Sequence, residues 1–146
     1  MKRHSSLAIL SREHHGALIL AQLLKKGAAV YKGLPTDLVG KAEYAVRFYR
    51  TELIKHFEEE EQVVIKKIKG INGNLDKLGS EIAEEHKRLR SSFESIKNAN
   101  DLATHLDELG FALDQHIRKE ERKFFPLIQE LCSEKLLSEI EQALSA

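Results

Sequence analysis

The sequence predicts an all-α protein: an antiparallel, up-down-up-down four-helix bundle with a short fifth helix at its C-terminal end. Apolar residues recur at steps of three and four along four long stretches, which is the spacing of one helix face. Residues that break helices gather in three places, around 27–35, 70–74 and 98–101, and no stretch alternates as a strand would. Because short connections join the stretches, neighbouring helices are expected to run antiparallel.

The first helix is predicted from residue 5 to about residue 28, where Gly27 helps to end it. His14 lies on its apolar face, whereas His15 is rotated away from that face by about 100°. We therefore take His14 as the inward-facing residue and keep His15 as the alternative, replacing or joining it. The inward face is formed by Leu7, Leu10, His14, Ala17, Ala21 and Leu24.

The second helix is predicted from about Pro35, a favourable first-turn residue, to about Lys69. Asp37 lies near its N-terminus, where the helix dipole favours negative charge. Alternating steps of four and three give the inward face a heptad-like pattern. This face is formed by Ala42, Val46, Tyr49, Leu53, His56, Glu60, Val63 and Lys67.

The third helix is predicted from residue 74 or 76 to about residue 98. A single polar residue, His86, interrupts its apolar face, so that histidine is expected to point into the core. The inward face is formed by Leu75, Leu78, Ile82, His86, Leu89, Phe93 and Ile96.

The fourth helix is predicted from a cap at residue 100 or 101 to about residue 131. Pro126 lies within it and predicts a kink or break after Phe125. A short last helix, capped by Ser133, is expected to cover one end of the bundle with Leu137, Ile140 and Leu144. The inward face of the fourth helix is formed by Leu102, Leu106, Leu109, Leu113, His116, Glu120, Phe124, Leu127 and Leu131.

Length and composition narrow the class of protein. The 146 residues suit one domain, with the bundle over about 5–131 and the short helix over 133–145. Basic and acidic side chains balance at 23 each, which favours neither nucleic acid nor a membrane surface as a partner. The first ten residues hold too short an apolar run for a signal peptide, so a cytoplasmic location is expected. The single cysteine, Cys132, excludes a disulfide within the chain and a cysteine-based metal site made by this chain alone.

The most informative feature is the motif His-x-x-x-Glu-Glu, which occurs at residues 56–61 and again at 116–121. Residues four apart share a helix face, so His56 lies beside Glu60 and His116 beside Glu120. One such pair alone is more often part of a solvated, charged surface. That explanation weakens because the motif recurs on two apolar faces and each of the other two faces carries a histidine.

We predict that these polar side chains bind metal at one level of the bundle. A buried carboxylate without a partner is costly or becomes protonated, whereas a cation favours ionised carboxylates and neutral imidazoles. Six ligands exceed the four of a structural zinc site, so they suit two metals bridged by the glutamates. The predicted ligands are His14, His56, Glu60, His86, His116 and Glu120.

With these residues the chain resembles a hemerythrin-like, HHE cation-binding domain over about 5–131. The resemblance implies a non-haem centre, usually of two iron ions with a bridging oxo or hydroxo group, although zinc or manganese would also suit the ligands. Glu61 and Glu121 are expected either to face outward or to support ligand histidines. The matching segments are Glu13-His14-His15, His56-x-x-x-Glu60, Glu85-His86 and His116-x-x-x-Glu120.

One departure from the family pattern bears on function. Oxygen-carrying hemerythrins have two histidines one turn apart on the third helix, whereas the residues one turn from His86 are Ile82 and Arg90. One metal is therefore expected to have one fewer histidine and a more open coordination sphere. This difference weighs against reversible oxygen carriage and favours redox reactivity or sensing.

The expected function is binding or sensing of dioxygen or a related small molecule, and we assign no catalytic residue. The alternatives are a redox enzyme acting on peroxide, oxygen or nitric oxide, an iron-handling protein, and a bundle that holds zinc for structure. A small ligand is the expected partner; the sequence specifies neither a redox partner nor an oligomeric state.

Overall fold

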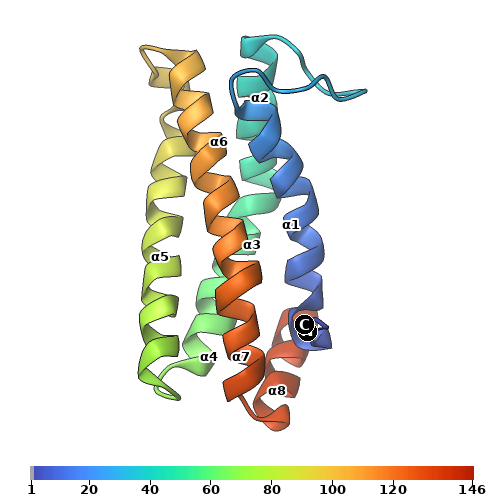
Figure 1. Ribbon diagram of the computed structural model, residues 1–146, viewed down its shortest axis with the longest axis vertical. Helices are drawn as coiled ribbons and strands as arrows, with labels where there is room; N and C mark the ends of the chain where they lie inside the picture. Colours follow the sequence, from blue (N-terminus) through green and yellow to red (C-terminus); the bar gives the residue numbers. More distant parts are fainter. Residues whose placement is uncertain (1) are drawn as a thin grey trace.

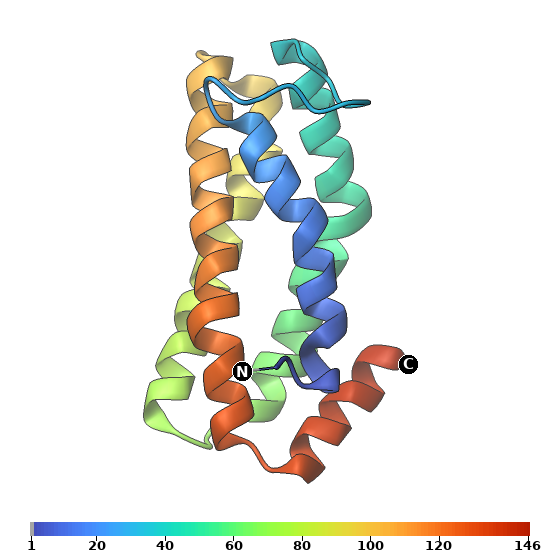
Figure 2. The same cartoon turned by 45° about the vertical axis from the view of Figure 1, so that its right-hand side comes forward.

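The computed structural model describes residues 2–146, which contain helices and connections but no strand. The long helical stretches, over 5–24, 38–68, 73–94 and 102–131, lie side by side along the long axis of a helical bundle (Figure 1, Figure 2). The prediction of an all-α protein is therefore confirmed. The α-helices are α1 (Ser5–Leu24), α2 (Leu38–Phe48), α3 (Ile54–Glu59), α4 (Lys66–Ile68), α5 (Gly73–Glu94), α6 (Leu102–Lys119), α7 (Phe125–Leu131) and α8 (Glu134–Ser145).

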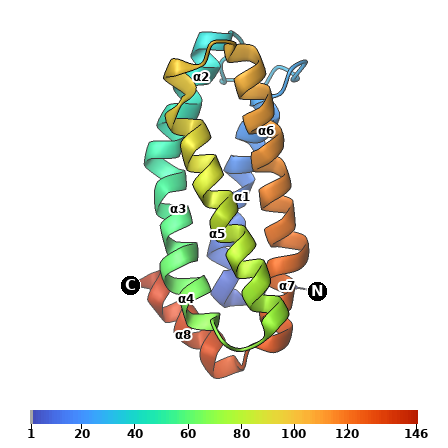
Figure 3. The same cartoon turned by 90° about the vertical axis from the view of Figure 1, so that its left-hand side faces the viewer.

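Helix α8 packs across one end of the bundle, next to the start of α1 and the ends of α4 and α7 (Figure 3). Its apolar residues Leu137, Ile140 and Leu144 are buried, as predicted. Ser133 caps it, because the Ser133 hydroxyl accepts a hydrogen bond from the backbone N–H of Leu136 at 3.2 Å. No helix in residues 2–146 combines the length and the apolarity needed to cross a membrane.

Caps correct two predicted helix boundaries. Helix α1 ends at Leu24 rather than near residue 28, because Lys25 is extended and Gly27 adopts a left-handed conformation with φ of 73°. Helix α2 begins at Leu38 rather than at Pro35. There the Asp37 side chain accepts the Gly40 N–H at 2.9 Å, which makes Asp37 the cap itself.

Three π-helical turns interrupt the α-helices: η1 (Tyr49–Leu53), η2 (Glu60–Ile65) and η4 (Glu120–Phe124). Their hydrogen bonds span five residues, as from the Ile54 N–H to the Tyr49 carbonyl. A fourth short element, η3 (Ile96–Asn98), is a 3₁₀ turn after α5. The π-helical turns shift the inward face by one residue, which the sequence reading did not anticipate.

The shift appears after both glutamates of the repeated motif. Beyond Glu60 the buried residues are Val64 and Ile68, so the predicted inward positions Val63 and Lys67 were wrong: Val63 is half-buried and Lys67 is exposed. The widened turn adds a residue, and the inward positions follow steps of four instead of alternating steps of four and three.

The same correction applies to the last long stretch, where Ile128 is buried and the predicted Leu127 and Leu131 are half-buried. The irregularity expected after Phe125 lies before it, in η4, where the Phe125 N–H bonds to the Glu120 carbonyl. Pro126 then falls in the first turn of α7, where its missing N–H costs nothing.

Two apolar clusters divide the core along the bundle axis. One contains Leu20, Tyr49, Phe93 and Leu106, and the other contains residues nearer α8, among them Ile68, Phe124 and Ile140. Between the two, each long helical stretch contributes buried polar side chains. The apolar clusters thus hold a polar layer in place from both sides.

Candidate metal centre

The polar layer consists of the six side chains predicted from the sequence. They come from all four long stretches, and each is between 0 and 4% exposed. Glu60 and Glu120 are the first residues of the π-helical turns η2 and η4, so each carboxylate enters the core where the helix widens. His15 is exposed, which leaves His14 as the inward histidine of α1. The layer contains His14, His56, Glu60, His86, His116 and Glu120.

These side chains form two overlapping groups, and the ligand atoms of each group lie within 4.8 Å of one another. One group pairs His14 with His56, the other pairs His86 with His116, and both groups include Glu60 and Glu120. Glu60 spans the two groups, because its Oε1 lies 3.0 Å from the Nε2 of His86 and its Oε2 lies 3.3 Å from the Nε2 of His56.

Glu120 joins the same two groups from the opposite helix. Its Oε1 lies 3.0 Å from the Nε2 of His14 and 3.3 Å from the Nε2 of His116. Two ligand atoms bound to one metal at about 2.1 Å are roughly 3–4 Å apart. The observed separations therefore suit a cation placed between the atoms of each group.

The polar atoms at the centre lack hydrogen-bond partners. Within the described residues 2–146, both oxygens of Glu60, both oxygens of Glu120, and the Nε2 atoms of His86 and His116 are buried without a hydrogen bond. Buried polar atoms in folded proteins almost always have a partner, because desolvation without one is costly. A cation shared by these nitrogen and oxygen atoms would supply what the protein lacks.

Each histidine is oriented by an outer glutamate that bonds to its Nδ1 at 2.6–2.8 Å. An ionised carboxylate only accepts hydrogen bonds, so Nδ1 carries the proton and the Nε2 of a neutral ring points a lone pair at the centre. This is the arrangement that metal-binding histidines adopt. The pairs are His14 with Glu121, His56 with Glu13, His86 with Glu61, and His116 with Glu85.

Glu61 and Glu121 are predicted to be either outward-facing or supporting residues, and the structure shows the supporting contacts. No role is predicted for Glu13 or Glu85. All four outer glutamates directly neighbour a predicted ligand in the sequence: two precede a histidine and two follow a glutamate. Their position next to a predicted ligand is the sequence feature that could have identified the outer glutamates. A side chain beside an inward position can lie at the edge of the buried face and reach a histidine on the adjoining helix.

The carboxylates also control the charge of the histidines. Burial lowers the pKa of His14, but the nearby carboxylates of Glu120 and Glu121 outweigh burial and raise that pKa to about 9. Burial likewise lowers the pKa of His116, and the charge of Glu120 outweighs it and raises that pKa to about 10. Without a cation the centre therefore attracts protons.

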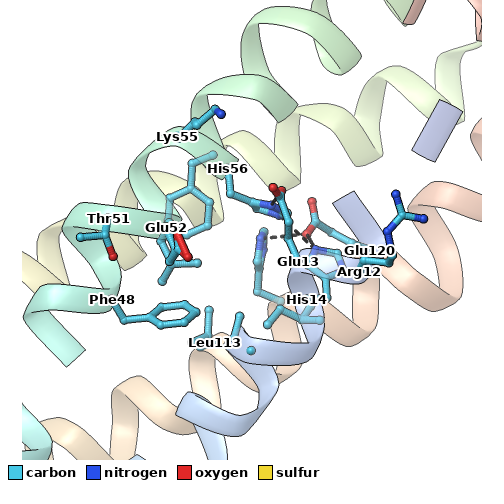
Figure 4. Close-up of a pocket in the computed structure, with 16 residues that line it drawn as sticks. Arg12, Glu13, His14, Phe48, Thr51, Glu52, Lys55, His56, Leu113 and Glu120 are labelled. Carbon is cyan, nitrogen blue, oxygen red and sulfur yellow. Dashed lines mark hydrogen bonds and ion pairs between the residues drawn. The ribbon is translucent and has the colours of Figure 1, made fainter. Parts of the chain in front are cut away.

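A pocket of about 370 Å³ leads from the surface to the His14–His56 side of the layer. Figure 4 shows His14, His56 and Glu120 on its inner wall, with Phe48 and Leu113 on the opposite wall. Gly16 also lines the pocket; a methyl group there would lie 3.4 Å from the Phe48 ring. A small molecule could reach the polar layer from this side.

The helical bundle and its buried histidine–carboxylate groups define a helical cation-binding domain. The family model described as the hemerythrin HHE cation binding domain matches residues 5–128. The chain belongs to this family, as the motif resemblance implied. No curated protein and no solved structure gave a significant match.

Proposed function

We propose that the protein holds two non-haem iron ions and uses them to bind or sense dioxygen or a related small molecule. The observation that carries this proposal is the position of Glu60 and Glu120, which are shared by two histidine pairs. Shared carboxylates allow two cations to lie side by side, which a single structural zinc site does not need.

The ligand set favours iron among the possible metals. Imidazole suits iron, zinc and copper, whereas carboxylate suits harder cations, and no thiolate is present in the six-residue layer. The two histidine pairs, together with the shared Glu60 and Glu120, would hold the two ions. An iron ion with six coordination positions would keep positions open for an oxo or hydroxo bridge and for a small ligand.

Bound iron would supply the electron transfer that small-ligand chemistry requires, while the protein supplies orientation and access. The outer glutamates hold the Nδ1 protons and thereby direct the Nε2 atoms inward. The pocket beside Phe48 would bring a ligand to the His14–His56 side. Around it, Phe57 and Ile117 exclude bulk water from the rest of the layer.

The same proposal includes the arrangement of the bundle. We infer the antiparallel, up-down-up-down order of hemerythrin-like bundles in a single domain, with α8 as the added fifth helix. The ribbon supports this order, because successive long stretches are joined at alternate ends of the molecule (Figure 1). This order would bring residues near the middle of each stretch to one level.

Anaerobic loading with ferrous iron tests the centre. We expect about two iron ions per chain and a visible absorption band that changes when dioxygen is admitted. The variant His14→Ala should lose at least one ion, whereas His15→Ala, which alters the exposed neighbour, should keep both. Native protein that takes up no iron would contradict the proposal.

The redox-enzyme alternative has its own support. Each group of candidate ligands contains two histidines and no third. The residue one turn after His86 is Arg90, which bonds to Glu61 and offers the centre no imidazole. A sphere with two histidines is more open than one with three. Sustained consumption of peroxide, oxygen or nitric oxide by iron-loaded protein with a chemical reductant would favour the enzyme; stoichiometric binding would favour the sensor.

A further inference from the structure

We infer that Arg3 and Arg90 are positioning residues, each of which fixes one histidine of the metal centre through a glutamate and a phenylalanine. The inference rests on the proposed centre and extends it outward, to side chains that touch no predicted ligand. Arg3 precedes α1 and Arg90 lies on α5, so the two residues are far apart in the sequence.

Arg90 supports His86 on two sides. It donates to both oxygens of Glu61, at 2.8 and 3.2 Å, and Glu61 bonds to the Nδ1 of His86 at 2.6 Å. The Arg90 guanidinium also lies 5.5 Å from the centre of the Phe57 ring. Phe57 in turn stacks on the His86 ring, with the ring centres 4.3 Å apart.

Arg3 makes corresponding contacts around His14, although it reaches one side-chain oxygen of Glu121 and donates a second hydrogen bond to the Glu121 carbonyl at 2.9 Å. It donates to Glu121 Oε1 at 3.0 Å, and Glu121 Oε2 bonds to the Nδ1 of His14 at 2.7 Å. The Arg3 guanidinium lies 5.4 Å from the centre of the Phe125 ring. Phe125 stacks on the His14 ring with an angle of 8° between the planes and 5.6 Å between the centres.

The internal repeat of the sequence does not account for this likeness. The repeat places the glutamates Glu61 and Glu121 at matching positions, and likewise the histidines His14 and His86, but the arginine and the phenylalanine of the two sets do not match. Phe57 directly follows a ligand histidine, whereas Phe125 lies beyond the π-helical turn η4. Two different backbone positions therefore deliver the same arginine, glutamate and phenylalanine contacts, which points to a requirement of the site.

Each arginine, together with its glutamate and phenylalanine, restrains one imidazole ring. An arginine fixes the direction of its glutamate, so that the glutamate stays in place to accept the Nδ1 hydrogen bond of the histidine. The flat guanidinium also attracts the face of the phenylalanine ring. The imidazole is thus held at its edge and on its face, and its Nε2 lone pair stays aimed at the centre.

The remaining two histidines lack such an arginine. The Nδ1 of His116 bonds to Glu85, which is paired with Lys119 at 2.9 Å, and the Nδ1 of His56 bonds to Glu13. Each histidine pair therefore contains one member fixed by an arginine: His14 in one pair and His86 in the other. Each arginine should act on its own metal position.

Cobalt titration of metal-free protein can resolve the two positions, because visible Co²⁺ bands report coordination geometry. The background His116→Ala leaves only the His14–His56 pair intact, and His56→Ala leaves only the His86–His116 pair. In the first background we expect Arg3→Gln to weaken Co²⁺ binding about tenfold and to shift the bands, with less than a twofold effect of Arg90→Gln. In the His56→Ala background we expect the reverse: Arg90→Gln should weaken Co²⁺ binding about tenfold, and Arg3→Gln should have less than a twofold effect.

Two further variants separate positioning from general stability. Arg88→Gln removes an exposed arginine from the same helix as Arg90 and should leave both positions unchanged. Arg3→Lys keeps the positive charge but loses the forked donors and the flat face of the guanidinium. It should therefore recover only part of the Co²⁺ affinity that Arg3→Gln loses. Circular dichroism of each metal-free variant would check that the helices remain, and Arg3→Lys serves if Arg3→Gln does not fold.

The outcomes distinguish the inference from the proposed centre. Native protein that binds two Co²⁺ ions, with arginine variants that bind as tightly as native or lose affinity equally at both positions, would overturn only the inference. Native protein that binds no Co²⁺ would overturn the inference and the dinuclear centre together.

Discussion

At the scale of single residues, we expect the centre to exchange protons for metal. The neutral histidines direct Nε2 lone pairs at the lone pairs of Glu60 and Glu120, and only a proton or a cation between them relieves that repulsion. This competition explains why the pKa of His14 rises to about 9 and that of His116 to about 10 in the metal-free protein, despite burial.

We therefore expect metal loading at pH 7.5 to release at least two protons per chain, because metal binds the neutral imidazole and the pKa values of His14 and His116 lie above this pH. Metal affinity should rise with pH until it levels off near pH 9–10, the pKa range of His14 and His116. Calorimetric titration with Zn²⁺ in buffers of different ionisation enthalpy would count the protons. Proton release near zero at pH 7.5 would contradict the assignment.

The same pKa values set the sign of the pH effect on the metal-free fold. The folded pKa values of His14 and His116 exceed the ordinary histidine value of 6.5, so their protons stabilise the fold fully below pH 6.5. This contribution should fade as the pH rises through 9 to 10.

The inner layer could be predicted from sequence because each of its six residues replaces an apolar residue in a periodic pattern. The outer glutamates could not be assigned in the same way. Glu13 and Glu85 sit beside the inward position, and their partners, His56 and His116, belong to other helices. Arg3 lies before any periodic stretch and contacts Glu121 only once the chain has folded.

At the scale of helices, the π-helical turns limited the sequence reading. Helical periodicity predicts which face is buried as long as each turn has the same number of residues. At Glu60 and Glu120 the turn widens, and the inward face beyond each one moves by a residue, to Val64 and Ile128. Nothing in residue composition marks these turns, whereas the caps at Asp37 and Ser133 follow known side-chain preferences.

The contact between α1 and α6 depends on a glycine. A methyl group on Gly110 would lie 2.6 Å from the backbone carbonyl oxygen of Ala21, which is closer than atoms can approach. We expect Gly110→Ala to push the two helices apart and lower the free energy of unfolding by roughly 1–3 kcal/mol. Chemical denaturation of metal-free protein would measure the change.

Gly73→Ala provides the matched control. Gly73 is the first residue of α5, and a methyl group there meets no atom within 4 Å. Alanine should be neutral or stabilise slightly, because it loses less conformational freedom on folding. Equal effects of the two substitutions would show that the close approach of α1 and α6 does not limit stability.

At the scale of the whole molecule, the two apolar clusters stabilise the fold, whereas the polar layer between them is the candidate binding site. Each cluster contains fully buried large side chains, such as Leu106 in one and Phe124 in the other. Burial of such side chains supplies the main driving force for folding. We therefore expect the fold not to depend on metal in the way that small zinc-bound domains do.

It follows that metal should stabilise a fold that already exists. We expect metal-free protein to remain helical and to unfold cooperatively, and bound metal to raise the unfolding temperature. At free metal a thousandfold above the dissociation constant, the gain at one site is about 4 kcal/mol. Thermal unfolding followed by circular dichroism, with and without a chelator, would measure it.

The variant Glu120→Ala separates this gain from non-specific effects of metal. It removes a carboxylate shared by both groups, so metal should no longer raise its unfolding temperature. The metal-free variant should itself stay folded because both apolar clusters remain, although it loses the contacts of Glu120 with His14 and His116 and a cavity is left. If chelation unfolded the native protein completely, the apolar clusters would be too weak to hold the layer, and the metal would have to be part of the core itself.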